Sequence, residues 1–222
     1  SARALQAVID PINSNPEVLD APNGGSIESI TIAAYEPAFG IIGNPAKMDP
    51  KTRQSADHSM AYIVSTLIRK ALDAKQAGNL ATGEGAGGAT WKQLMLSPYD
   101  YAKDAINDTR TRALMKKITF THGGPDYDKN YPDGIPTAMI VTTAAGATHD
   151  SGMVMYPAGH ARNETADLAG ILEHKFNLLG SIASDTPADL IARYRNLGAK
   201  SADDIKNINT FDLTLRDDFE DA

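Results

Sequence analysis

A histidine and a tyrosine stand four residues apart in the most regular apolar stretch of the sequence. That stretch, residues 52–72, repeats apolar side chains at helical spacing and predicts one helix, on which His58 and Tyr62 share a face one turn apart. A histidine beside a tyrosine can share proton transfer at one carbon–oxygen unit of a substrate. The same spacing is typical of the polar edge of a packed helix, so both interpretations stay open.

A second group of chemically capable residues follows an expected strand, in the segment YPAGHAR at residues 156–162. Its proline and glycine predict a sharp turn of the backbone, which would display His160 and Arg162 at the end of a sheet. Arginine is suited to bidentate binding of a carboxylate. A structured turn with a surface arginine fits the same residues, and this alternative also stays open.

The other histidines and the cysteine count limit the chemistry. We expect His122 in a loop, His149 at a surface position of a strand, and His174 as a structural residue of an amphipathic helix. No pair of histidines or carboxylates has a convincing metal-ligand spacing, so no metal is predicted. The chain contains no cysteine, which excludes disulfides, thiolate nucleophiles and iron–sulfur clusters within it.

Composition narrows the class of partner. The chain has 222 residues, of which 42% are hydrophobic and 22% charged, as in ordinary globular proteins. A formal net charge of −7 gives nothing that would attract nucleic acid or an anionic membrane. An anionic substrate would need a local cluster of basic side chains to overcome this charge. No apolar run approaches the roughly 20 residues of a membrane span, so none is predicted.

The pattern of elements predicts an α+β fold, with helices on one face of a small antiparallel sheet and further helices at the C-terminal end. A hairpin turning at Ala145-Gly146 is expected to join two of its strands. Residues 37–50 and 123–136 are expected to be loops. The expected strands are 26–34, 118–122, 137–143 and 148–156, and the expected helices are 1–10, 52–72, two short ones within 91–117, 167–182 and 187–197.

Two motifs carry a resemblance to a known family. Residues 53–62, RQSADHSMAY, resemble the ADHS-x-x-Y helix of the MmgE/PrpD family. YPAGHAR at 156–162 resembles the Y-P-x-G-H-A-R segment of the 2-methylcitrate dehydratase branch, whereas the first motif is shared with cis-aconitate decarboxylases too. IESITIAAYEP and TRALMKKITF follow the family's order, so the similarity covers nearly the whole chain. HGGPDYDKNYPDGIPT and VMYPAGHARN look most like eukaryotic, fungal-type members.

The resemblance implies a domain organisation. Family members have a large all-helical domain and a smaller α+β lid, described as chorismate-mutase-like, with the active site between them. Residues 1–24 would then be the end of a helical segment and a linker, and 25–165 the lid. Residues 166–222 would be C-terminal helices that pack on an all-helical N-terminal domain absent from this chain. Such a fragment is expected to be inactive alone.

The resemblance also implies an activity. The whole enzyme would remove water from 2-methylcitrate, with His58 in proton transfer and Tyr62 as a hydrogen-bond donor to the hydroxyl or a carboxylate. Arg53, His160 and Arg162 would bind the carboxylates. No metal or other cofactor is expected, the substrate is a small tricarboxylate, and the enzyme would be a homodimer. Its compartment would be the mitochondrion for fungal-type members and the cytoplasm for bacterial ones.

Two alternatives remain. One is decarboxylation of cis-aconitate by a related enzyme with a similar tricarboxylate pocket. The other is a folded fragment without activity, such as an antigen, which would associate with itself through exposed apolar patches.

Overall fold

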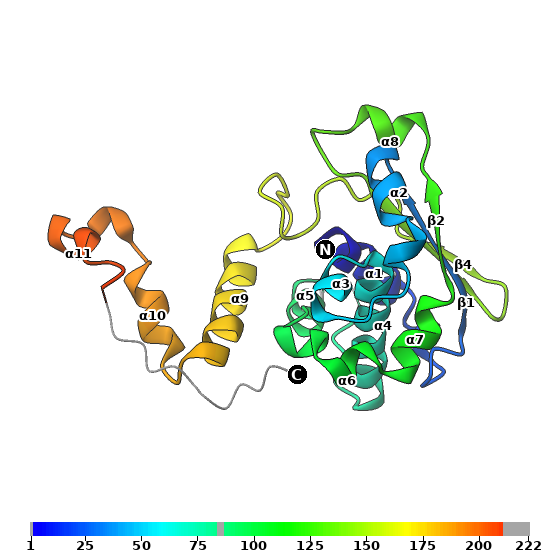
Figure 1. The fold of residues 1–222 in the computed structure, drawn as a ribbon, viewed down its shortest axis with the longest axis horizontal. Coiled ribbons are helices and arrows are strands. Elements are labelled where there is room, and N and C mark those ends of the chain that lie inside the picture. Colours follow the sequence, from blue (N-terminus) through cyan, green and yellow to red (C-terminus); the bar gives the residue numbers. More distant parts are fainter. Residues whose placement is uncertain (1, 84–86, 211–222) are drawn as a thin grey trace. The chain divides into compact units, whose positions relative to one another are not determined.

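The computed structural model describes residues 2–83 and 87–210. The chain divides into two compact units, residues 1–168 and 169–222 (Figure 1). Residues 211–222, at the end of the predicted C-terminal region, lie outside the described part. Within the described part, no helix is both long enough and apolar enough to cross a membrane.

The first unit contains both helices and strands, and the second contains helices. In chain order, the first holds α1 (Ala2–Ser14), η1 (Pro16–Leu19), β1 (Ile27–Ala34), α2 (Glu36–Ile42), η2 (Pro45–Lys47), α3 (Arg53–Asp57), α4 (Met60–Gln76), α5 (Gly87–Leu94), η3 (Pro98–Tyr101), α6 (Lys103–Ile106), α7 (Thr109–Met115), β2 (Ile118–His122), α8 (Pro125–Lys129), β3 (Thr137–Thr143) and β4 (Thr148–Asp150). The helix α9 (Leu168–Ala183) starts at the boundary, and α10 (Pro187–Arg193), η4 (Leu197–Ala199) and α11 (Ala202–Lys206) follow it.

A four-stranded sheet in the order β2-β1-β3-β4 organises the first unit. The predicted α+β class is confirmed, but the prediction of an antiparallel sheet is wrong because β1 and β2 run parallel. The chain leaves β1 and passes through α2 to α7 before it returns as β2, and such a long crossover is what parallel neighbours require. β3 pairs antiparallel with both β1 and β4, which confirms the expected hairpin.

One face of the sheet carries the core of this unit. Side chains alternate between buried and half-buried along β1 and β3, and the register sets Ile30 opposite Val141 and Ile32 opposite Met139. The helices α1 and α4 lie along this face (Figure 1), and Ile68 of α4 lines the same small internal gap as Met139 and Val141. The alternation follows from the two-residue period of a strand with one buried face.

The single helix predicted over 52–72 is wrong, because the chain forms α3 and α4 with a break at His58-Ser59. The Ser59 side chain caps α4 by accepting a hydrogen bond from the backbone N–H of Tyr62, at 3.2 Å. Its hydroxyl also donates to the carbonyl of Lys47, at 2.6 Å, and Ser59 is fully buried. A serine with these two partners starts a new helix. The apolar periodicity continues across this position, so the periodicity alone predicts one uninterrupted helix.

Other helices and strands also begin or end at residues that differ from the expected ones. The first helix continues past Pro11 to Ser14, because burial of Val8, Ile9 and Ile12 outweighs the backbone hydrogen bond that proline cannot donate. Residues 37–50, expected to be a loop, contain most of α2 and all of η2, and α8 lies within the expected loop 123–136. The strand expected to reach residue 156 ends as β4 at Asp150. Beyond it, the backbone N–H of Ser151 donates to the carbonyl of Met139 in β3 at 3.0 Å, and Val154 forms an isolated bridge with Thr137.

A glycine next to the core provides a test of this packing. Gly24 has a φ of +70°, and a Cβ added there would lie 2.8 Å from Cδ2 of the buried Leu114. We expect Gly24→Ala to lower the free energy of unfolding by about 2–4 kcal/mol, from left-handed strain plus overpacking. Gly146→Ala is the matched control, since Gly146 has a φ of +85° and open space around it, and should lose only about 1–2 kcal/mol. Urea denaturation measures both, and equal losses would contradict the packing argument.

Candidate functional site

The first predicted group of site residues lies around the break between α3 and α4. Arg53 begins α3 and is half-buried, while Thr52 and Ser55 form a capping box in front of it. His58 ends α3 and is exposed, with Nδ1 2.9 Å from the carbonyl oxygen of Gln54. This contact favours the tautomer in which Nδ1 carries the proton and donates it, leaving Nε2 as the free base.

Tyr62 occupies a different environment from His58. Its ring is fully buried in the first turn of α4, and its hydroxyl donates to the backbone carbonyl of Asp100 at 2.5 Å. Burial raises the pKa of the Tyr62 hydroxyl above its usual value. The expectation that His58 and Tyr62 share one helical face is therefore wrong, because the chain changes direction at Ser59 between them.

Ionic interactions and hydrogen bonds hold Asp100, the residue whose carbonyl accepts the Tyr62 hydroxyl, in place. The Asp100 carboxylate accepts from Nζ of Lys70 at 3.0 Å and from the backbone N–H of Ser97 at 2.8 Å. A guanidinium nitrogen of Arg69 lies 3.7 Å from its other oxygen. Asp100 is nearly buried, so these donors replace the water that its charge would otherwise require.

The second predicted group forms a compact turn. Pro157 accepts the backbone N–H of His160 at 2.7 Å, and Nδ1 of His160 accepts the backbone N–H of Arg162 at 3.1 Å. The Arg162 guanidinium donates to the carbonyl of Asp133 at 3.1 Å and lies 5.9 Å from the centre of the Tyr156 ring. Its side chain is 58% exposed, so the guanidinium can still reach a ligand.

Comparison with known proteins assigns part of the chain to a family. Residues 90–193 match the MmgE/PrpD C-terminal domain, and this range includes the YPAGHAR turn. The matched part of the chain belongs to the MmgE/PrpD family. That family includes dehydratases. No curated protein matches the chain significantly. Arg53, His58 and Tyr62 lie before the matched range, and His160 and Arg162 lie within it. The roles of all five stay predictions.

The structure also brings together a polar cluster that the sequence analysis missed. His122 is the last residue of β2, as the expected strand 118–122 has it, and not a loop residue. Its Nε2 lies 2.9 Å from Asp128 and 3.6 Å from Glu36. The other oxygen of Asp128 accepts the backbone N–H of Glu36 at 2.8 Å. The sequence holds a local signal for the contact between His122 and Asp128, because the two residues flank the turn at Gly123-Gly124. Glu36 comes close to them only because β1 and β2 are parallel neighbours, which the sequence does not indicate.

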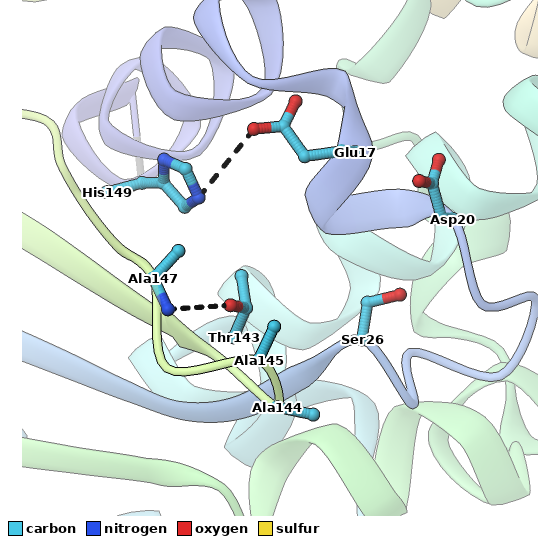
Figure 2. A pocket seen from close by; sticks show the side chains of 8 residues that line it. All are labelled: Glu17, Asp20, Ser26, Thr143, Ala144, Ala145, Ala147 and His149. Atoms are coloured by element: carbon cyan, nitrogen blue, oxygen red, sulfur yellow. Dashed lines mark hydrogen bonds and ion pairs between the residues drawn. The ribbon is translucent and has the colours of Figure 1, made fainter.

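A pocket of about 390 Å³ lies beside the hairpin turn between β3 and β4 (Figure 2). Glu17 and Asp20 project into it from one side and His149 from the other. His149 is only 12% exposed, against the expectation of a surface position, and its Nε2 lies 3.9 Å from Glu17. The Asp20 carboxylate is bound by Nζ of Lys75 at 2.5 Å. Within residues 2–83 and 87–210, no cluster of three His, Cys, Asp or Glu side chains could hold a metal ion.

The helical second unit has an apolar groove of its own, about 910 Å³ in volume, between α9 and α10. Leu172 and Phe176 line it from α9 and Tyr194 follows α10, and all three are exposed. An ion pair between Glu173 and Arg195, at 2.8 Å, lies among the lining residues.

The buried hydroxyl of Tyr62 leads to a prediction about stability. Tyr62→Phe leaves the ring in place but removes the donor to the Asp100 carbonyl. We expect the free energy of unfolding to fall by about 1–2 kcal/mol, the cost of an unpaired buried acceptor. Tyr131→Phe, which keeps its ring stacked on Tyr35, is the control and should change stability little. Unchanged stability in Tyr62→Phe would contradict a structural role for this hydroxyl.

The contacts of Asp128 lead to a prediction about pH. The backbone N–H of Glu36, and then the imidazole of His122, lower the pKa of the Asp128 carboxyl. A lowered pKa means that the carboxylate stabilises the fold fully above the usual Asp pKa near 4, and that this contribution disappears as pH falls through the lowered value. Asp128→Asn should therefore be less stable than wild type at pH 5, with the difference shrinking towards pH 2. Urea denaturation across this range tests it, and a constant difference would contradict the assignment.

Proposed function

We propose that the protein containing this chain is a 2-methylcitrate dehydratase, a hydro-lyase of propionate catabolism by the methylcitrate cycle. The observation that carries the proposal is the YPAGHAR turn, which lies within the matched family range and holds an exposed arginine beside a histidine. The resemblance to fungal-type members extends the proposal to a mitochondrial homodimer.

The reaction determines which groups the site needs. A base removes a proton from the carbon next to a carboxylate, the C–O bond on the neighbouring carbon breaks, and an acid protonates the departing hydroxyl. The electron pair of the C–H bond becomes the alkene of 2-methyl-cis-aconitate, and water leaves. Because the proton is weakly acidic and the substrate carries three carboxylates, the site also needs cationic donors that stabilise the developing negative charge.

The described contacts support these roles to different degrees. His58 is exposed and keeps Nε2 as a free base, which suits proton transfer. Arg162 offers an exposed guanidinium for a carboxylate, with His160 next to it and Arg53 as a further cation. Tyr62 could act on the substrate only by exchanging the Asp100 carbonyl for a substrate oxygen, since that carbonyl occupies its hydroxyl.

Activity measurements on the protein that contains this chain test the proposal. With 2-methylcitrate, we expect formation of the alkene without carbon dioxide. His58→Gln should lower kcat by about 100-fold or more, as loss of a proton-transfer group does, and Arg162→Gln should mainly raise KM. His174→Gln on α9 is the control. Carbon dioxide release from cis-aconitate would favour the decarboxylase alternative, and wild-type kcat/KM in both variants would contradict the assigned roles.

A further inference from the structure

A third cavity, of about 550 Å³, lies between the segment that precedes α3 and the end of α7 with the start of β2. Its lining contains three cationic side chains, Lys51, Arg112 and Lys116, and one carboxylate, Asp49. Met48, Met115 and Ile118 supply apolar lining. In a chain with a net charge of −7, this is the kind of local basic cluster that binding of an anionic ligand requires.

The three cations are held to different degrees. Each of the three guanidinium nitrogens of Arg112 donates a hydrogen bond within the protein: Nε to the carbonyl of Ile106, one terminal nitrogen to Asp49, and the other to the carbonyl of Pro50. Arg112 therefore builds the wall of the cavity and fixes the 49–50 segment. In the described part of the chain, Lys116 makes no hydrogen bond or ion pair through its ammonium group.

The ammonium group of Lys51 can leave Asp49 for a ligand with little loss of stability. Its Nζ lies 2.8 Å from Asp49, but the two side chains are 68% and 63% exposed, and so exposed an ion pair is weak. Asp49 keeps Arg112 as a partner when Lys51 leaves, at 2.6 Å. The cavity thus has two ammonium groups, on Lys51 and Lys116, that can turn to a ligand without leaving a buried charge unpaired.

The cavity is also connected to the predicted catalytic segment. The backbone N–H of Lys51 donates to the Ser55 hydroxyl of α3, at 3.1 Å, and Ser55 forms the capping box that starts α3. A ligand that contacts Lys51 therefore contacts the segment that carries Arg53 and His58. Asn107, on the cavity rim, adds an amide that can donate to a carboxylate.

We propose that this cavity binds a small polycarboxylate anion, with Lys51 and Lys116 binding separate carboxylates and Arg112 as the positioning residue. Two ammonium groups from separate segments of the lining suit a ligand whose charges are spread over several carboxylates better than a compact anion with one charged centre. The choice of a polycarboxylate rests on the proposed function, because the substrate proposed there is a tricarboxylate. The site itself rests on the cavity and its charges.

Isothermal titration calorimetry of the 222-residue chain with citrate tests this site, because citrate has three carboxylates and is not the proposed substrate. We expect binding that weakens as salt is added, and no binding of trimethyl citrate, which has a similar shape without charge. Lys51→Gln and Lys116→Gln should each weaken citrate binding roughly threefold to tenfold, as loss of one charged contact does. Lys175→Gln on α9 removes the same charge outside the lining residues and should leave the affinity unchanged.

Two results would overturn the proposal. One is the absence of citrate binding to the wild-type chain, and the other is equal weakening in all three lysine variants, which would indicate a general effect of net charge. The outcomes separate this site from the proposed activity. Citrate binding that depends on Lys51 and Lys116 in a protein that does not dehydrate 2-methylcitrate supports the site and contradicts the activity. Dehydration of 2-methylcitrate by a protein whose citrate binding is unchanged in both variants contradicts the site and supports the activity.

Discussion

The nearly buried carboxylate of Asp100 is the charge around which the helices of the first unit are arranged. Lys70 and Arg69 approach it from α4, Ser97 donates to it from the preceding turn, and its backbone carbonyl accepts the hydroxyl of Tyr62. A buried ion pair is costly to desolvate and costlier to break, so these partners must all be present together. Two positions of α4 that lie about two turns apart are thereby fixed to one point of the η3 segment.

This arrangement determines what the neighbouring residues can do. Because Tyr62 points inward to Asp100, the start of α4 is fixed, and Ser59 can cap it while binding Lys47. His58 then lies at the joint between two helices, exposed and hydrogen-bonded to the turn behind it. The family motif around ADHS is therefore a bend with one accessible histidine, and its tyrosine belongs to the core. The cationic cavity begins on the other side of the same segment, where Lys51 bonds to Ser55.

The YPAGHAR turn is organised in a different way. Several of its contacts are local, since the His160 N–H donates to the carbonyl of Pro157 and the Arg162 N–H donates to His160. Two partners lie further away, since Arg162 donates to the carbonyl of Asp133 and the Ala158 N–H donates to the side chain of Gln6. A turn that is stabilised largely by its own hydrogen bonds can expose an arginine without a network of buried charges. The turn lies within the range that matches the MmgE/PrpD C-terminal domain.

The sequence by itself determined the α+β class, the positions of the strands and main helices, the hairpin and the family, because each depends on short-range periodicity, turn residues or motifs. Tertiary structure alone decided that β1 and β2 are parallel, that Ser59 divides a helix, that Tyr62 is buried, and that Lys51 and Lys116 share a cavity. The physical reason is that these outcomes depend on groups far apart in the chain. The Lys47 carbonyl that binds Ser59, the Asp100 carbonyl that binds Tyr62, and the α7 end that faces Lys51 become neighbours only when the long crossover closes over the sheet.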